Sequence, residues 1–106
     1  MAHGDVNEVR LLGRVSGVAE VRELPSGDVV HGFRLVARRP KNARSGVDTI
    51  DVAAWTPATR RVVGRLSVEE RVEVTGSIRR RFFRAGGAVA SRYEVEATRI
   101  RRLSPE

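Results

Sequence analysis

The sequence predicts an all-β fold in which five strands form a small barrel, with one short helix between the third and fourth strands. Two observations predict this class. Apolar residues alternate at period two along most of the chain, and clusters rich in Gly, Pro and Ser divide the alternation into short segments. With 106 residues, 41% of them hydrophobic, the chain has the length of one domain and enough apolar side chains for a core. We therefore expect one domain over residues 1–106, with flexible ends at residues 1–6 and 104–106.

The N-terminal part predicts two strands with an extended piece between them. One face of residues 9–15 carries only apolar side chains and a glycine, which is typical of a half-buried strand. A short extended piece over residues 18–24 leads into a Pro-Ser-Gly-Asp turn at residues 25–28, where proline fixes φ and glycine allows a positive φ. Residues 29–38 alternate again and form the second strand, and the basic, turn-rich residues 39–46 form a loop.

The third strand and the helix follow directly on each other. Residues 48–55 alternate so that Ile50 faces the core and Trp55 faces the opposite way. Thr56 is then a suitable N-cap and Pro57 a suitable first helical residue, so the helix is expected to begin there.

The fourth and fifth strands form a hairpin. Residues 71–83 make the fourth strand, in which Phe82 shares the core-facing positions and Phe83 points outward. The turn is expected at residues 84–87, which contain two glycines. In the last strand the apolar spacing shifts by one residue after Ala97, and this predicts a β-bulge. Five strands and one helix in this order describe an OB-fold, a Greek-key barrel whose open face binds oligonucleotides.

The charge balance favours a polyanionic partner. Twenty basic residues against thirteen acidic ones give a formal net charge of +7, and all the basic residues except Lys41 are arginines. An arginine offers a planar fork for phosphate and a flat face for stacking. A merely solvated basic surface is the alternative interpretation of the same excess.

The composition excludes several function classes. Without cysteine the chain has no disulfide, thiol nucleophile or zinc-finger site, and its two histidines lack partners at metal-ligand or nucleophile spacing. We therefore expect no enzyme activity, no metal and no cofactor. No apolar run reaches the roughly 20 residues of a membrane span, and no signal peptide is recognised. We expect a cytoplasmic protein with no membrane partner.

Four segments resemble the bacterial single-stranded DNA-binding protein family in order and spacing. They are Asn7-x-Val9-x-Leu11-x-Gly13, the Glu20–Leu35 hairpin, Asp48-x-Ile50-Asp51-Val52-x-x-Trp55 and Gly76-x-Ile78-Arg79-x-Arg81-x-Phe83. The resemblance implies sequence-nonspecific binding of single-stranded DNA in replication, repair and recombination, in association with the nucleoid. It also implies a homotetramer, with a homodimer as the alternative, and outward-facing Leu12 and Val36 are compatible with either.

The resemblance assigns roles to particular residues. Trp55 and Phe83 match stacking positions of the family, and Arg79, Arg81 and Arg22 match its phosphate-binding positions. The basic pattern adds four further DNA-binding candidates, which are Arg84, Arg34, Arg38 and Lys41. For Trp55 a place in the core is the alternative interpretation. Tyr93 is interpreted as a core or interface residue, with base stacking as the alternative.

The sequence also departs from the family pattern. Thr49 stands at a third aromatic position, Asp51 would repel phosphate, and the loop at residues 39–46 is short and lacks an aromatic residue. These differences predict weaker and more salt-sensitive binding, typical of a specialised paralogue. No acidic tail is recognised, so partners recruited through such a tail are not expected. Two other functions stay open: an adaptor similar to primosomal replication protein N, and an RNA-binding OB domain.

Overall fold

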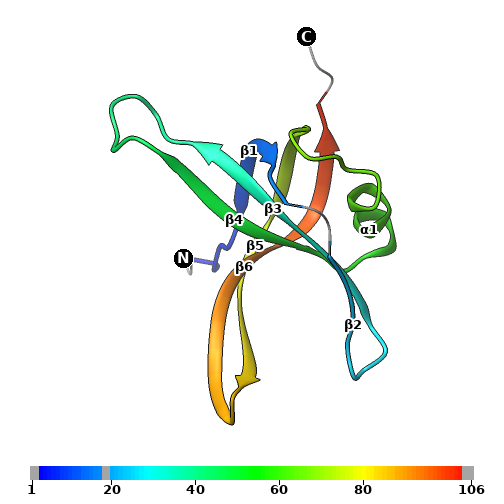
Figure 1. Cartoon of the computed structure of the whole chain (residues 1–106). Coiled ribbons are helices and arrows are strands. Elements are labelled where there is room, and N and C mark those ends of the chain that lie inside the picture. Colours follow the sequence, from blue (N-terminus) through cyan, green and yellow to red (C-terminus); the bar gives the residue numbers. More distant parts are fainter. Residues whose placement is uncertain (1–2, 18–19, 104–106) are drawn as a thin grey trace.

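The alternation of apolar and polar residues forms six strands in the computed structural model, which describes residues 3–17 and 20–103 (Figure 1). In chain order the elements are β1 (Val9–Val15), β2 (Glu20–Glu23), β3 (Val29–Arg38), β4 (Val47–Ala54), α1 (Pro57–Val63), β5 (Arg71–Ala85) and β6 (Ala88–Arg102). The predicted all-β class and the position of the helix are confirmed. The extended piece predicted at residues 18–24 contains a further strand, β2, in the part that the structure describes. The described sheet therefore has six strands rather than the predicted five. Parts of the predicted flexible ends, residues 1–2 and 104–106, lie outside the described residues.

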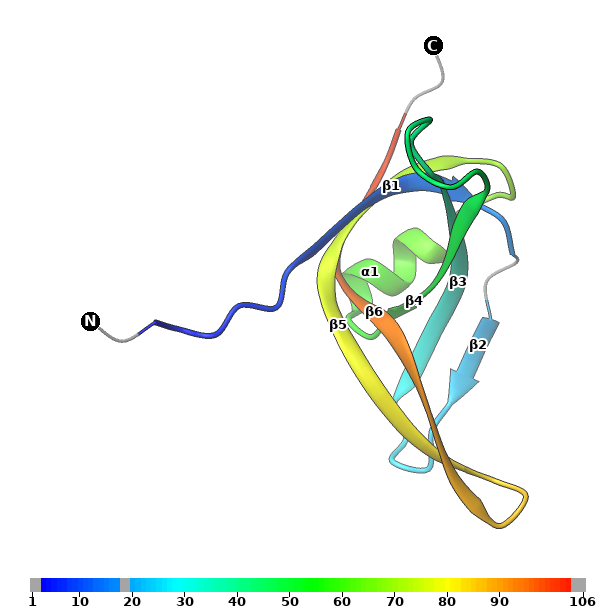
Figure 2. The ribbon, with the colours of Figure 1, turned by 90° about the vertical axis from the view of Figure 1, so that its left-hand side faces the viewer.

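The strands close into a barrel (Figure 2). Their order in the sheet is β1-β5-β6-β4-β3-β2, and an additional pairing of β1 with β3 closes the ring, with β2 paired to β3 outside it. All the pairings are antiparallel except that of β4 with β6. Residues 3–8 form no strand and extend away from the barrel. The core lies inside the barrel and consists mainly of β-branched and small side chains, which are Val15, Phe33, Leu35, Val52, Ala54, Val63, Val72, Val74, Val95, Ala97 and Ile100.

The helix begins where the sequence predicts. The Thr59 N–H donates a hydrogen bond of 3.2 Å to Oγ1 of Thr56, and Pro57 lies in the first turn, where its missing N–H costs no hydrogen bond. Val63 is buried in the core. The position of α1 directly after β4 places Trp55 at the junction between strand and helix.

The predicted β-bulge is confirmed in β6. Thr75 pairs with Arg99 but the next residue, Gly76, pairs with Ala97, so Thr98 is the extra residue. The Thr98 hydroxyl donates to the Thr75 carbonyl at 3.0 Å. Because the bulge inserts one residue, Ala97 and Ile100 both face the core although they are three residues apart.

The β5–β6 hairpin extends beyond the barrel, and this corrects the prediction for its tip (Figures 1 and 2). The prediction of Phe82 as a core residue is wrong, because its side chain is 63% exposed. Ile78 and Tyr93 are exposed as well, so a core place for Tyr93 is also wrong. Alternation correctly separates the two sides of a strand. Beyond the barrel, however, neither side has a core to face.

Two smaller expectations also need correction. β5 continues to Ala85, so the turn consists only of Gly86 and Gly87, whose φ angles are 58° and 83°. Arg84 therefore belongs to the strand and not to the turn. Val36, expected to face outward, is buried because β3 pairs there with both β1 and β4. Leu12 is exposed as expected.

Two carboxylates tie the barrel strands together and make its stability depend on pH. Glu73 of β5 accepts hydrogen bonds from Nε of Arg10 on β1 (2.7 Å) and from Nε of Arg101 on β6 (3.1 Å). The hydrogen bond from Arg10 holds the pKa of Glu73 below its ordinary value of 4.5, and Arg102 lowers the pKa of Glu70 in the same way.

A carboxyl group with a lowered pKa in the folded state stabilises the fold fully above its unfolded pKa. This stabilisation is lost as the pH falls through the folded pKa. We therefore expect the free energy of unfolding to decrease as the pH falls below about 4.5, and Glu73→Gln to make that decrease smaller. Urea denaturation at a series of pH values measures both. An identical pH dependence in the variant would contradict the assignment.

Candidate nucleic-acid interface

The two faces of the β5–β6 hairpin differ in charge. Residues that pair directly across the hairpin share a face, and Arg81 pairs with Arg92 while Arg80 pairs with Tyr93. We call the first side the Trp55 face, which carries Arg79, Arg81, Phe83, Arg92, Glu94 and Glu96 on the hairpin. We call the second side the reverse face, which carries Ile78, Arg80, Phe82, Arg84, Val89, Ser91 and Tyr93. Both of the hairpin's glutamates, at positions 94 and 96, thus lie on the Trp55 face.

Trp55 is half-buried, and a guanidinium covers its ring. The Arg81 side chain crosses from β5 so that its guanidinium carbon lies 4.6 Å from the Trp55 ring centroid, within cation–π range. Nε of Arg81 donates a hydrogen bond to Glu94, whose side chain is almost completely buried. Trp55 Nε1 is also buried, and it has no hydrogen-bond partner among the described residues. Trp55 therefore belongs to a layered arrangement of indole, guanidinium and carboxylate.

Phe83 lies further along the same face, toward the hairpin tip. Its side chain is 42% exposed, and the residue directly opposite on β6 is the small Ala90. An exposed phenyl ring beside a small neighbour offers a flat surface to a stacked base. The structure thus brings Trp55 and Phe83 to the same side of the hairpin, as the sequence predicts. The Phe83 ring is exposed to solvent, whereas the Trp55 ring is half-buried.

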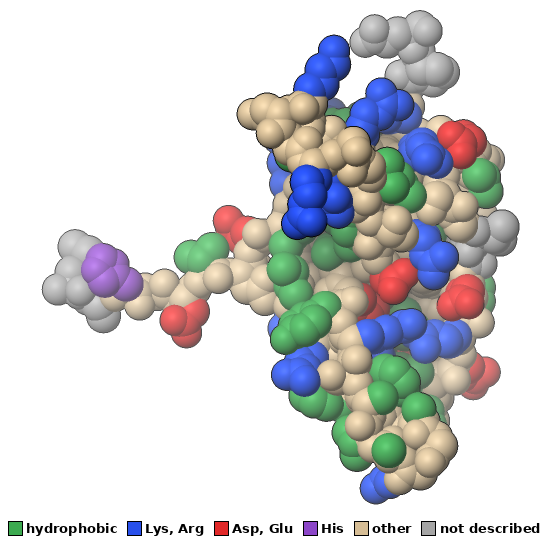
Figure 3. Space-filling model, turned by 60° about the vertical axis from the view of Figure 1, so that its left-hand side comes forward, with side chains coloured by type: hydrophobic (Ala, Val, Ile, Leu, Met, Phe, Trp, Pro, Cys, Tyr) green, Lys and Arg blue, Asp and Glu red, His purple; other side chains and the backbone are tan. Residues whose placement is uncertain are grey.

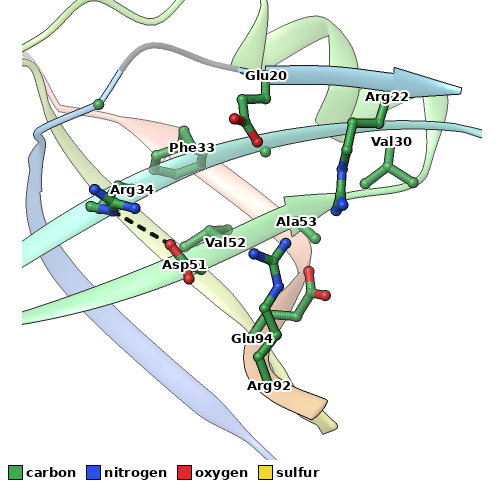
Figure 4. Close-up of a pocket in the computed structure, with 12 residues that line it drawn as sticks. Glu20, Arg22, Val30, Phe33, Arg34, Asp51, Val52, Ala53, Arg92 and Glu94 are labelled. Carbon is green, nitrogen blue, oxygen red and sulfur yellow. Dashed lines mark ion pairs between the residues drawn. The ribbon is translucent and has the colours of Figure 1, made fainter. Parts of the chain in front are cut away.

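A groove of about 320 Å³ lies between β2, β3, β4 and β6 and includes Glu94, the partner of Arg81, in its lining (Figure 4). Arg22 and Arg92 extend into it from different strands. Arg34 lines it as well and forms a 3.5 Å ion pair with Asp51. Three arginines and three carboxylates line the groove, which are Arg22, Arg34, Arg92, Glu20, Asp51 and Glu94. The groove is therefore balanced in charge rather than strongly basic.

The ion pairs on this face differ in how easily a phosphate could replace the carboxylate. Arg79 lies 3.3 Å from Glu96 and is well exposed, as is Arg34 beside Asp51. Exposed pairs of this kind contribute only about 0–1 kcal/mol, so exchange for a phosphate costs little. In the pair between Arg81 and Glu94 the carboxylate is buried and the guanidinium is partly exposed, so separating them leaves a buried carboxylate without a compensating charge, at a cost of up to about 3–5 kcal/mol. Arg79 is thus better suited than Arg81 to bind a phosphate.

The structure does not bring every predicted residue to this site. Arg38 and Lys41 lie at the β3–β4 loop, at the opposite end of these strands from Trp55 (Figure 1). Arg84 lies on the reverse face of the hairpin.

Comparisons with known proteins identify the family. The family model described as "Single-strand binding protein family" matches residues 6–103. The chain belongs to this family. Among solved structures it is similar to the Plasmodium falciparum SSB in complex with ssDNA, with a TM-score of 0.77 and 21% sequence identity over 98% of this chain and 100% of that chain. No curated protein matches significantly. The predicted OB-fold and the predicted function class, single-stranded DNA binding, are confirmed, and the adaptor and RNA-binding alternatives are not favoured.

Sequence reasoning missed two residues of this single-strand binding protein's site. Arg92 lines the groove and Glu94 holds Arg81, but neither was among the predicted site residues. The signal that could have found them is the Gly86-Gly87 turn. A two-residue turn fixes the hairpin register, and this register places Arg92 opposite Arg81 and Glu94 opposite Arg79.

The charge of Glu94 is expected to weaken DNA binding by this family member. Glu94→Gln keeps a hydrogen-bond acceptor for Arg81 but removes the charge that neutralises it. We expect oligo-dT affinity to rise and its dependence on log salt to steepen by about 0.7, the value for one additional phosphate contact. Fluorescence titrations over a salt series measure this. Glu96→Gln, which alters an exposed pair, is the matched control with a smaller effect, and an unchanged slope in Glu94→Gln would contradict the explanation.

Proposed function

We propose that the protein coats single-stranded DNA without strong sequence preference, by stacking bases on Trp55 and Phe83 and neutralising phosphates with neighbouring arginines. The observation that carries this proposal is the common face of the two aromatic rings in a chain of this family. Arg79 and Arg22 are the arginines best suited to phosphate, because both are exposed. Arg81 instead packs against the Trp55 ring and places a positive charge beside it. The ssDNA bound to the similar Plasmodium falciparum protein supports the same ligand class here.

The lack of sequence preference follows from the kind of contacts available. Every base has a π-face, so stacking on an aromatic ring tolerates any base. Phosphate contacts by arginine carry no sequence information. The Asp51 and Glu94 carboxylates in the groove oppose a phosphate chain there, so the proposal includes weaker and more salt-sensitive binding than a groove without these acids would give.

The test is a fluorescence titration with oligo-dT, in which the only tryptophan reports directly on the site. We expect quenching of Trp55 and a loss of affinity with salt at a slope of about −0.7 per phosphate neutralised. A duplex of equal length is the control, because its bases are already stacked on each other. Equal affinity for the duplex, or no quenching by oligo-dT, would overturn the proposal.

We further propose that the protein assembles as a homotetramer, with a homodimer as the alternative. The pairing of β1 supports self-assembly. This strand lies at one end of the strand order, and its residues 9–13 pair only with β5 in the described sheet, so their other edge is unpaired. An edge of this kind can pair with the same edge of a second copy. Leu12 on β1 adds an exposed apolar side chain. Light scattering that gives the mass of a monomer would contradict both states.

The proposed setting is replication, repair and recombination, as a nucleoid-associated cytoplasmic protein. Its support is the family match together with a net charge of +7, which suits a protein held near DNA. We also propose that residues 1–106 act as one domain. As a separate finding, no helix in the described ranges is long and apolar enough to cross a membrane.

A further inference from the structure

The reverse face of the hairpin combines exposed aromatic rings with arginines that have no acidic neighbours there. Phe82 is 63% and Tyr93 64% exposed, and both lie outside the site described above. The Arg80 guanidinium lies 4.9 Å from the Phe82 ring centroid and 5.6 Å from that of Tyr93, and its Nε donates to Ser91 Oγ at 3.1 Å. Arg80 is thus fixed between two rings in one extended platform.

The two faces also differ in free positive charge. No carboxylate lies on the reverse face of the hairpin, and among the described ion pairs none includes Arg80 or Arg84. On the Trp55 face, by contrast, Arg79 and Arg81 are paired with glutamates, and of its three arginines only Arg92 has no ion pair among the described residues. Figure 3 shows hydrophobic and basic side chains together on the lower part of the molecule, where the hairpin lies.

We propose that the reverse face is a second binding surface for single-stranded nucleic acid, in which bases stack on Phe82 and Tyr93 and phosphates bind Arg80 and Arg84. The inference rests on the proposed function in that both faces take the same ligand. Phe82 and Phe83 are consecutive residues that point to opposite sides of one two-stranded ribbon. A single-stranded nucleic acid with one base stacked on Phe83 therefore needs only to pass around the edge of the hairpin for another base to reach Phe82.

Charge complementarity favours nucleic acid over a second copy of this chain as the occupant. In a twofold-symmetric contact the same patch lies on both subunits. Two reverse faces would therefore bring Arg80 and Arg84 of both copies together without a carboxylate from either hairpin face. A phosphate chain supplies the missing negative charge, and its bases cover the exposed rings.

Photocrosslinking locates the bound strand directly. The wild-type protein is irradiated with an oligo-dT of about 30 nucleotides that contains 5-bromodeoxyuridine, and the adducts are mapped by peptide mass spectrometry. An OB-fold binds about 4–16 nucleotides, so an oligomer of about 8 nucleotides serves as a short probe for the Trp55 face alone. We expect adducts at Phe82 or Tyr93 with the long oligomer. Adducts confined to the Trp55 face would overturn the inference.

The double variant Phe82→Ala/Tyr93→Ala measures the contribution of the platform. We expect it to lower affinity for the long oligomer by about fivefold or more for each base platform removed. Quenching of Trp55 by the short oligomer should stay unchanged. Arg84→Ser should reduce the salt slope for the long oligomer by about 0.7. The matched controls are Val21→Ala, an equally exposed apolar residue on β2, and Arg61→Ser, an exposed arginine on α1.

The outcomes separate this inference from the proposed function. If Trp55 is quenched but the double variant binds the long oligomer like the wild type, only the second surface is refuted. If the double variant keeps its affinity and loses mass in light scattering, the reverse face is an interface between copies. If adducts form at Phe82 or Tyr93 while Trp55 is never quenched, the second surface stands and the proposed role of Trp55 fails.

Discussion

Replacing Trp55 with alanine is expected to lower affinity for oligo-dT by about five- to 150-fold, because stacking of one base contributes about 1–3 kcal/mol. The indole also supports the guanidinium of Arg81 at 4.6 Å. Its removal therefore takes away a base platform and the surface that positions a cation beside it. Phe83→Ala should produce a loss in the same range without the second effect, since no guanidinium lies within cation–π distance of its ring in the described residues.

The measurement uses the anisotropy of a labelled oligo-dT, because Trp55→Ala also removes the intrinsic fluorophore. Trp55→Phe keeps a flat ring and is the matched variant, for which most of the affinity should remain. Since Trp55 is half-buried, urea denaturation of each variant must accompany the titration. Trp55→Ala that folds like the wild type and binds oligo-dT equally well would show that the indole contacts no base.

Most of the barrel was predictable because its alternation is set by burial. Ile50, Val52 and Ala54 lie at alternate positions of β4 and all face the core. The helix start was predictable for a local reason, since Thr56 and Pro57 satisfy the requirements of a helix N-terminus without help from the rest of the fold. Even the bulge in β6 could be inferred, because a shift in apolar spacing has no other simple explanation in a strand.

The hairpin beyond the barrel was not predictable in the same way. Phe82 and Ile78 alternate correctly with Phe83, but the sequence does not indicate where β5 leaves the barrel. The pairing that decides this is long-range: Gly76 is the last β5 residue opposite β1, where it pairs with Val9. Beyond Gly76 on β5 and before Val95 on β6, the two strands pair only with each other, and the hairpin leaves the barrel and its core.

The site shows the same division between local and distant causes. Trp55 and Phe83 could be placed on one face from parity and family resemblance. The cover of Arg81 over Trp55 depends on Glu94, which comes from another strand and is fixed by the hairpin register. Single-sequence reasoning assigns a side chain to a side. It does not show which of several arginines there is already held by a carboxylate.

Gly76→Ala is expected to destabilise the fold by about 3 kcal/mol, in the upper range for adding a carbon to a closely packed position. A Cβ at Gly76 would lie 2.1 Å from the carbonyl oxygen of Glu96, and 3.1 Å from Cα of Ala97. Both contacts are backbone atoms of β6, so no side-chain rotation can relieve them. The strands would have to separate at the bulge, where the hairpin leaves the barrel.

The bulge explains why this glycine is required although its φ is ordinary. The extra residue Thr98 moves β6 across β5, and the β6 backbone then passes over the position where a side chain of residue 76 would begin. Gly64→Ala is the matched control, because its Cβ would have no contact closer than 3.6 Å and its φ is −62°. We expect Gly64→Ala to leave the free energy of unfolding unchanged or to raise it slightly.

Urea denaturation compares the two alanine variants, and oligo-dT titration below the transition follows the site. Arg79 and Glu94 pair across the hairpin only three residues beyond Gly76, so a shift of β5 against β6 also alters the ion pairs that support Trp55. Gly76→Ala should therefore lose DNA affinity even where it is still folded, whereas Gly64→Ala should keep it. Equal unfolding free energies for the two variants would show that β6 can move away from β5 at little cost, and the bulge would then not fix the position of the hairpin.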